Sequence, residues 1–248
     1  EELKSQSKNV FSISLEGGGV ADFDIKFERL NECCLEATLT SPFGKGRFVL
    51  NTVSRFLAFD VLCSVSALLC EGYDIKILES ISNNIKFPEG RMDFITIDEN
   101  NECCVDFAHT PEALETTLKE INSAFQGKIW CLFGCGGDRD KIKRPIMGKI
   151  AEDLSYKVVI TNDNPRFENE DQIIKEIISG MNNPNSVDII KDREKAILFC
   201  LKKMTSSKTN NILLIAGKGH EKYQQIGKTK SAFSDAKVVE SFKALRYE

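Results

Sequence analysis

From about residue 103 to residue 216, short apolar runs alternate with longer amphipathic segments, and this alternation constrains the fold more than any other feature. The apolar runs predict strands at residues 103–107, 129–133, 157–161, 187–190 and 212–216. Apolar positions at helical spacing predict helices at residues 111–125, 145–154, 171–181 and 193–204. Strict alternation with apolar strands predicts an α/β fold built on a mainly parallel, doubly wound sheet.

Four of these strands end in polar or glycine-rich motifs. The motifs lie at residues 106–111 (Asp-Phe-Ala-His-Thr-Pro), 134–145, 163–166 (Asp-Asn-Pro-Arg) and 217–221 (Gly-Lys-Gly-His-Glu). In an open α/β sheet, ligands bind at the edge where the carboxyl ends of the parallel strands meet. We therefore expect the four motifs to share one rim of the sheet.

The motif at residues 134–145 begins with glycines and continues with cations. Gly134, Gly136 and Gly137 allow the backbone to come close to a ligand. The cations that follow are Arg139, Lys141, Lys143 and Arg144. This combination predicts an anion-binding loop, followed by a helix with Pro145 in its first turn. Whether the last three cations form a solvated face or face phosphates stays open.

The remainder of the chain has a different pattern. Residues 10–15, 23–27 and 34–40 predict a β-meander or sheet edge, and residues 56–69 and 75–81 predict helices. The sequence Pro-Glu-Gly-Arg-Met at residues 88–92 breaks the pattern, which predicts a domain boundary near residue 90 with Gly90 as a hinge. Near the end, residues 225–233 predict a hairpin, and Ser234 caps a last helix that extends to residue 245.

The composition is that of a globular protein, with 42% hydrophobic and 28% charged residues. A formal net charge of −4 argues against nucleic acid as the main partner. The most apolar stretch, residues 56–70, is too short to span a bilayer and contains Asp60, so no membrane insertion is expected. Nine cysteines in apolar stretches without a CxxC pair, together with only two histidines, predict reduced core thiols in a cytoplasmic protein and no metal site.

In this order and at this spacing, the motifs resemble those of the Mur ligases, ATP-dependent amide-forming enzymes of peptidoglycan synthesis. The resemblance covers the Gly-Arg-Met sequence at residues 90–92 and all four strand-end motifs. It implies a Rossmann-like C-terminal domain at residues 91–248 that binds the incoming amino acid. Residues 1–90 would then be the end of the central α/β ATPase domain. Because the chain starts at Glu1 without an initiator Met or signal peptide, we interpret it as the C-terminal part of a longer protein.

The resemblance also implies a reaction. With ATP and Mg²⁺ as cofactors, the D-Glu carboxylate of UDP-MurNAc-L-Ala-D-Glu becomes an acyl phosphate, which the amine of meso-diaminopimelate attacks. The family's P-loop and its magnesium-binding lysine are expected in the missing upstream domains, because the pattern G-x-x-x-x-G-K-[ST] does not occur in this sequence. We therefore expect no catalytic residue and no metal ligand in this chain, and no activity from it alone.

Site residues follow from the same resemblance. It assigns meso-diaminopimelate binding to Arg139, Asp163, Asn164, Arg166, Gly217 and Glu221, and ATP contacts to Arg91, Asp106 and His109. Arg166 carries the specificity for diaminopimelate over lysine, because a guanidinium matches a carboxylate with two parallel hydrogen bonds. Glu221 would accept a hydrogen bond from the distal ammonium.

Alternatives exist for the residues and for the whole chain. Asp163–Arg166 could be only a strand-terminating turn, and Asp106 could be only a strand-end cap. The chain could instead be part of a ligase similar to folylpolyglutamate synthetase, which shares the two-domain plan but lacks the Asp-Asn-Pro-Arg motif. It could also be a non-catalytic amino-acid-binding module or a structural descendant of the fold.

Overall fold

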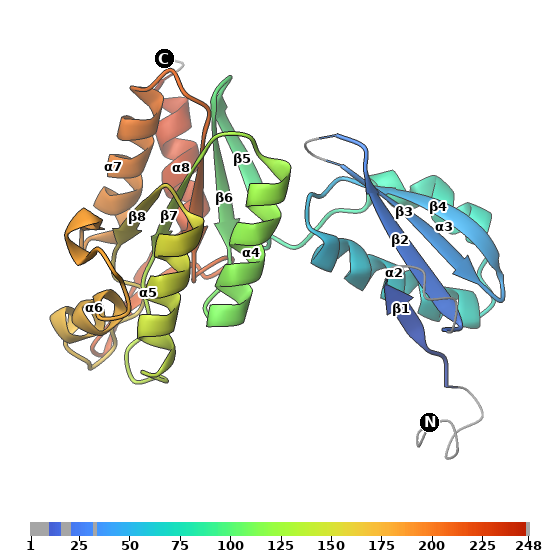
Figure 1. Cartoon of the computed structure of the whole chain (residues 1–248), viewed down its shortest axis with the longest axis horizontal. Helices are drawn as coiled ribbons and strands as arrows, with labels where there is room; N and C mark the ends of the chain where they lie inside the picture. The colour runs from blue at the N-terminus through green and yellow to red at the C-terminus, as the bar shows by residue number, and fades with distance from the viewer. Residues whose placement is uncertain (1–9, 16–20, 32–33, 247–248) are drawn as a thin grey trace. The chain divides into compact units, whose positions relative to one another are not determined.

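The structure is a computed structural model that describes residues 10–15, 21–31 and 34–246. The chain divides into two compact units, Glu1–Phe87 and Pro88–Glu248, and the division falls next to the boundary expected near residue 90. Figure 1 shows the elements of each unit.

The N-terminal unit is a four-stranded sheet covered by two helices. Its strands are β1 (Ile13–Leu15), β2 (Phe23–Arg29), β3 (Leu35–Ser41) and β4 (Gly44–Leu50), in that spatial order. Helix α2 (Arg55–Cys70) packs against β2 and β3, and α3 (Ile75–Ile81) packs against β4. The two helices were predicted correctly, and Ser54 caps the first of them by accepting a hydrogen bond from Leu57 N.

In this unit the meander alternative was wrong, although β1 does lie at a sheet edge, and one strand was missed. Strands β1 and β2 are parallel, so the first three strands do not form a meander. Strand β4 was missed because its first residues, Gly-Lys-Gly at positions 44–46, have the composition of a turn. It nevertheless pairs with β3 along its whole length, and its residues Phe48 and Leu50 are fully buried in the core of the unit.

The C-terminal unit has a six-stranded sheet with the order β5-β6-β10-β7-β8-β9. The strands are β5 (Asp93–Asp98), β6 (Asn101–Asp106), β7 (Lys128–Phe133), β8 (Lys157–Ile160), β9 (Asp188–Ile189) and β10 (Asn211–Ala216). All pairs are parallel except β5 with β6. The antiparallel strand β5 was not predicted. It lies at the edge of the sheet and most of its residues are exposed or half-buried, so it lacks the apolar run that indicated the other strands.

Helices cover both faces of this sheet (Figure 1). The helices α4 (Pro111–Ala124), α5 (Lys143–Leu154) and α6 (Glu170–Ile178) pack side by side, whereas α7 (Arg193–Thr205) and α8 (Asp235–Ala244) pack together. One core cluster joins sheet residues such as Val105 and Leu132 to α7 and α8 residues such as Cys200 and Val239. The Rossmann-like, mainly parallel, doubly wound fold expected from the sequence is therefore present.

Local sequence signals explain where the helices begin. Thr110, Asn169, Asp192 and Ser234 each cap a helix by accepting a hydrogen bond from a backbone N–H of the first turn. Helix α5 has no side-chain cap, and Pro145 lies in its first turn as predicted. The expected hairpin is formed by β11 (Tyr223–Ile226) and β12 (Thr229–Ala232).

The described cysteines are all free, but not all of them belong to a core. Cys103, Cys104, Cys131, Cys135 and Cys200 are buried, and burial raises the pKa of the Cys131 thiol to about 12. Cys70 is exposed and Cys34 and Cys63 are half-buried, so the expectation of core positions was wrong for these three; Cys33 lies outside the described residues. Within the described ranges, no helix combines the length and apolar character needed to cross a membrane.

Candidate functional site

The four strand-end motifs converge at the carboxyl edge of the six-stranded sheet, as the sequence predicted. Gly217 N, after β10, donates to Asp106 O at the end of β6, at 3.0 Å. The loops after β7 and β8 are joined by a hydrogen bond from Gly137 N to Asn164 O, at 2.9 Å. Because β10 lies between β6 and β7, the loops after these strands surround one region of the sheet edge.

Glycine is required where the loops after β7 and β8 touch. A Cβ added to Gly137 would lie 1.9 Å from Pro165 O, a distance that no side chain tolerates. A Cβ on Gly136 would lie 2.9 Å from Nη1 of Arg166, which is the movable end of a side chain. The glycines thus allow the two loops to pack directly on each other and bring the guanidinium of Arg166 over Gly136.

Arg144 belongs to the interior of the molecule. Its side chain is fully buried, and its guanidinium forms two parallel hydrogen bonds with Glu168, at 2.7 and 2.8 Å, and a third with Glu176 at 2.6 Å. A further bond reaches Gly136 O at 3.2 Å. Arg144 therefore anchors the glycine loop to the segment after β8 and is not a ligand-facing cation.

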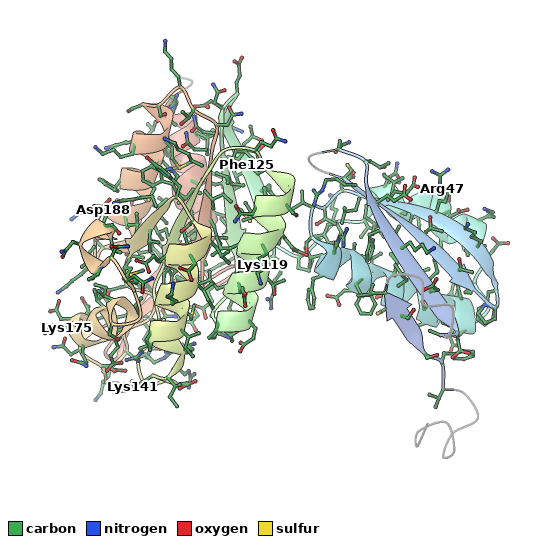
Figure 2. The ribbon with its side chains drawn as sticks, viewed as in Figure 1. Arg47, Lys119, Phe125, Lys141, Lys175 and Asp188 are labelled. Atoms are coloured by element: carbon green, nitrogen blue, oxygen red, sulfur yellow. The ribbon has the colours of Figure 1, made fainter. Side chains whose placement is uncertain are left out.

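The neighbouring lysines also have partners within the protein. Lys141 pairs with Glu168 at 2.9 Å while its side chain stays 59% exposed (Figure 2). Lys143 Nζ donates to His109 O at 2.7 Å and so ties the loop after β6 to the start of α5. Hydrogen bonds from Arg144, and then from Lys141, outweigh the effect of burial and hold the pKa of Glu168 well below its ordinary value.

Two arginines are available to a ligand. Arg139 is exposed, and no hydrogen bond or ion pair of its guanidinium is found among the described residues. Arg166 uses Nη1 to donate to Gly137 O at 2.8 Å, and Nε and Nη2 have no such bond within the same ranges. The backbone of Arg166 has a φ of +51° and is held by Gln225 O and Gly227 N of the β11–β12 hairpin. Both side chains flank Gly136, since its added Cβ would also lie 3.6 Å from Cγ of Arg139.

Asn164 and Glu221 form one buried polar network with Lys218. The Lys218 ammonium, which is fully buried, donates to Glu221 Oε2 at 2.9 Å and to Asn164 Oδ1 at 3.1 Å. The Asn164 amide donates to the same Glu221 oxygen at 2.9 Å, and its Oδ1 also accepts from Gln225 N at 2.8 Å. Asn164 is only 2% exposed, so its side chain positions Glu221 and is poorly placed to contact a ligand directly.

A second carboxylate lies beside this network. Gly217 has a φ of +112°, and a Cβ there would lie 2.8 Å from Oδ2 of Asp163. Asp163 is 8% exposed, and no hydrogen bond to its carboxylate occurs among the described residues. Glu221 is 22% exposed, and burial opposes its ionisation; hydrogen bonds from Lys218 and Asn164 outweigh burial and lower its pKa.

The residues assigned to ATP lie around the loop after β6. Arg91 places its guanidinium 4.7 Å from the centre of the Phe107 ring, and the His109 ring meets the same ring edge-on at 4.6 Å. His109 Nδ1 donates to Phe107 O at 2.8 Å, and Nε2 has no hydrogen-bond partner among the described residues. Arg91 and His109 are exposed.

Asp106 differs from these two because its carboxylate is satisfied internally. It accepts from Met92 N and Ala108 N, both at 2.8 Å, and from Thr117 Oγ1 at 3.3 Å. Burial raises the pKa of Asp106 in spite of these donors. The contacts are those of a strand-end cap that holds the Gly-Arg-Met segment onto β6.

Gly90, expected as a hinge, is closely packed within the C-terminal unit. It has a φ of +67°, and a Cβ there would lie 2.2 Å from both Gly219 C and His220 N. Its N–H donates to Asp93 Oδ2 at 3.2 Å. The segment at residues 90–92 therefore packs onto the loop after β10, and the hinge at Gly90 stays a prediction.

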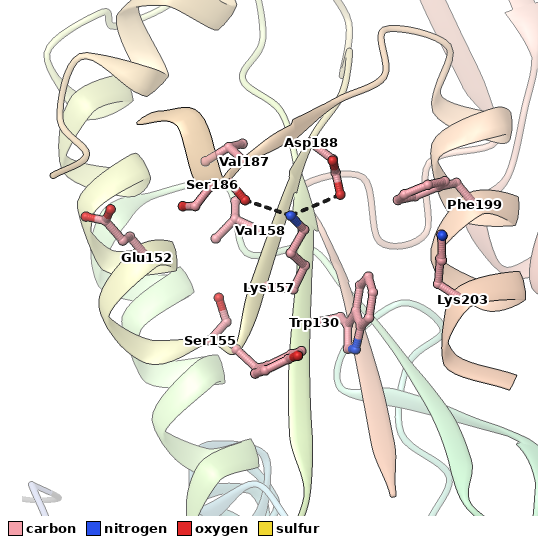
Figure 3. A pocket seen from close by; sticks show the side chains of 11 residues that line it. Trp130, Glu152, Ser155, Lys157, Val158, Ser186, Val187, Asp188, Phe199 and Lys203 are labelled. Carbon is pink, nitrogen blue, oxygen red and sulfur yellow. Dashed lines mark hydrogen bonds and ion pairs between the residues drawn. The ribbon is translucent and has the colours of Figure 1, made fainter. Parts of the chain in front are cut away.

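A hollow of about 490 Å³ lies at the opposite, amino-terminal edge of the sheet, between Trp130, Phe199 and Lys157 (Figure 3). The Lys157 ammonium is held there by Ser186 O at 2.7 Å and by Asp188 at 3.1 Å. None of the predicted site residues lines it. The candidate site is therefore separate from this hollow and is formed by the strand-end loops. In the part of the chain that the structure describes, no group of three or more His, Cys, Asp or Glu side chains could hold a metal ion.

Sequence reasoning missed the residues that organise the site. Lys218 stood inside a quoted motif, but a lysine between glycines gives no sign that it is buried. Glu168 lies two residues after Arg166, and only the folded chain brings it to Arg144. The available signal was the excess of cations at residues 139–144, which requires acidic partners somewhere if any of them is buried.

Comparisons with known proteins agree with this arrangement. A family model described as "Mur ligase, glutamate ligase domain" matches residues 90–236. A curated relative from Buchnera aphidicola, the UDP-N-acetylmuramoyl-L-alanyl-D-glutamate--2,6-diaminopimelate ligase, is 44% identical over 209 residues, which cover 84% of this chain and 41% of the relative. A relative of the same name from Haemophilus influenzae is 40% identical over 207 residues, covering 84% and 42%.

A solved structure with that ligase name superposes with a TM-score of 0.68 at 30% identity. It covers 99% of this chain and 51% of the solved chain. The present chain thus spans about two fifths of the length of these curated relatives.

Proposed function

Since the chain belongs to the Mur ligase family, we propose that it is the amino-acid-binding part of a ligase that adds meso-2,6-diaminopimelate to UDP-MurNAc-L-Ala-D-Glu. The curated relatives carry the name of that activity. In this proposal residues 91–248 are the Rossmann-like domain that binds the amino acid, and residues 1–90 are the end of the ATP-binding central domain. We place the protein in the cytoplasm, where ATP and UDP-linked precursors occur.

The observation that carries the proposal is that two guanidinium groups with unused donors and two carboxylates with unused oxygens lie at one sheet edge. The distal centre of meso-diaminopimelate bears a carboxylate and an ammonium. Arg139 and Arg166 offer the hydrogen-bond donors for the carboxylate, and both flank Gly136. Glu221 and Asp163 offer acceptors for the ammonium, with Gly217 leaving room beside Asp163. Lysine lacks the distal carboxylate, so Arg166 would contribute nothing to its binding.

The nucleotide is proposed to meet this chain at Arg91 and His109. Arg91 can pair with a phosphate, since its guanidinium is exposed and already oriented by the Phe107 ring. His109 offers its free Nε2, while Asp106 acts by holding the Gly-Arg-Met segment in place. When bound, ATP supplies the phosphoryl group that activates the D-Glu carboxylate. Mg²⁺ is proposed to be held by residues that precede this chain.

The chain's own contribution to the reaction is positioning. By holding the distal end of diaminopimelate, the arginines and carboxylates leave the other amine free to attack the activated carboxyl group. Fixing the attacking group converts a bimolecular step into an effectively unimolecular one, which is a large part of enzymatic acceleration. The proposal therefore assigns specificity to this chain and activation to the rest of the protein.

Phosphate release tests whether this chain supplies specificity while the rest of the protein supplies activation. The 248-residue chain alone should release no phosphate from ATP in the presence of the UDP-linked dipeptide and diaminopimelate. The full-length protein should release phosphate only when both substrates are present, and should prefer diaminopimelate to lysine. Turnover by the chain alone would show that the ATP site has been wrongly placed, and a full-length preference for lysine would refute the substrate.

A further inference from the structure

Lys218 is a fully buried cation at the candidate site that no part of the proposed reaction uses. Burying an ammonium group is costly unless it is paired and hydrogen-bonded. Here the cost is offset by Glu221 Oε2 at 2.9 Å, by Asn164 Oδ1 at 3.1 Å and by the Tyr223 ring, whose centre lies 5.5 Å from Nζ.

The network constrains the Glu221 carboxylate asymmetrically. Oε2 accepts from both the Lys218 ammonium and the Asn164 amide, so the carboxylate has a fixed orientation. Oε1 accepts no hydrogen bond from any of the described residues, and the side chain is 22% exposed. One oxygen is held by the protein and the other remains available.

We propose that Lys218 is a positioning residue that acts through Glu221, holding this carboxylate so that its second oxygen receives the ammonium of the bound amino acid. The inference rests on the proposed function and deepens it, because it explains how the site distinguishes an amino acid from a plain dicarboxylate. Without Lys218, the Glu221 carboxylate would lose its ion pair and one of the two donors that hold Oε2.

The surrounding charges support this role. Arg166, from the loop after β8, also favours the charged form of Glu221 and so lowers its pKa. Arg193, at the start of α7, is fully buried, and its Nε and Nη2 donate to Asp235 at 2.8 Å and to Ala216 O at 3.0 Å. Its Nη1 has no hydrogen-bond partner among the described residues, so within these ranges Lys218 and not Arg193 forms the ion pair with Glu221.

The test compares two ligands on the 248-residue chain by NMR titration. The ligands are meso-diaminopimelate and pimelate, a dicarboxylate of the same chain length without ammonium groups. Lys218→Met removes the charge at nearly constant length. The matched control is Lys222→Met, four residues later. Its side chain is 71% exposed and, among the described residues, pairs only with the exposed Glu89.

Wild type should bind diaminopimelate more tightly than pimelate. Lys218→Met should reduce that preference by about tenfold or more, the scale of one charge-assisted hydrogen bond, while pimelate affinity stays within about twofold. Lys222→Met should leave both affinities unchanged. If Lys218 had only a structural role, Lys218→Met would lower the affinities for both ligands by similar factors, which would overturn the inference.

The outcomes separate the two proposals. A wild type without preference for diaminopimelate would overturn the proposed function and this inference with it. A wild-type preference that survives in Lys218→Met would overturn the inference alone. If Lys218→Met does not fold, the carboxyl carbon of Glu221 can be titrated by NMR in the wild-type chain. A Glu221 pKa below the usual value of about 4.3 supports the inference, whereas one at or above that value overturns it.

Discussion

Replacing Arg166 by alanine should change substrate selectivity more than any other single substitution in this chain. A charge-assisted contact between a guanidinium and a carboxylate contributes about 1.5–3 kcal/mol, and each 1.4 kcal/mol corresponds to about a factor of ten. The preference for diaminopimelate over lysine should therefore fall by about one to two orders of magnitude.

The structure separates this loss from general damage to the loop. Arg166 also donates to Gly137 O at 2.8 Å, and losing that bond costs about 0.5–1.5 kcal/mol. That cost affects both amino acids equally and cancels in their ratio. The φ of +51° is strained for arginine and for alanine alike, so the substitution does not change the backbone preference at this position.

The assay is kcat/KM for diaminopimelate and for lysine in the full-length protein that contains this chain. Arg166→Lys should fail to restore the ratio, because an ammonium cannot form two parallel bonds with a carboxylate. Lys175→Ala, which removes an exposed cation from α6 (Figure 2), controls for the change in net charge and should leave the ratio intact. An unaltered ratio in Arg166→Ala would refute the assignment of Arg166.

Four further substitutions test the geometry. Glu168→Gln should lower the free energy of unfolding by about 2–3 kcal/mol at pH 7, because it breaks the pair with buried Arg144. Because the folded-state pKa of Glu168 is lowered, the difference in unfolding free energy between variant and wild type should have its full size above about pH 4.3 and shrink as the pH falls below it. A difference in urea unfolding that is constant from pH 7 to pH 3 would contradict the pairing. Gly137→Ala should lower the free energy of unfolding by about 1–3 kcal/mol, as measured by thermal unfolding. Gly136→Ala should change it by no more than about 1 kcal/mol but should weaken diaminopimelate binding severalfold. Equal stability of the two variants would count against the loop packing. Gly90→Ala should destabilise the C-terminal unit by about 2 kcal/mol or more, and an unchanged melting temperature would show that the contact with the loop after β10 is not made.

The sequence alone determined the architecture of the C-terminal unit, because its strands are short apolar runs whereas its helices have apolar residues at helical spacing. The alternation from residue 103 gave every parallel strand and the helices between them, and the strand-end motifs were correctly expected on one rim. Weak or mixed signals failed: β4 was hidden by glycines and β5 by its partly exposed edge position. Edge strands and glycine-rich strands carry little local information, since their stability comes from pairing with a neighbour.

Which charged residues are exposed at the sheet edge and which are buried was decided only by the tertiary structure. In the sequence, Arg139 and Arg144 are equivalent cations of one loop, but folding leaves the first exposed and buries the second against Glu168. In the same way Lys218 is an unremarkable lysine until the loops after β8 and β10 meet, and then it holds Glu221. The reason is physical: the partner that makes a buried charge tolerable comes from a distant segment, and local sequence does not specify which segment the fold will place there.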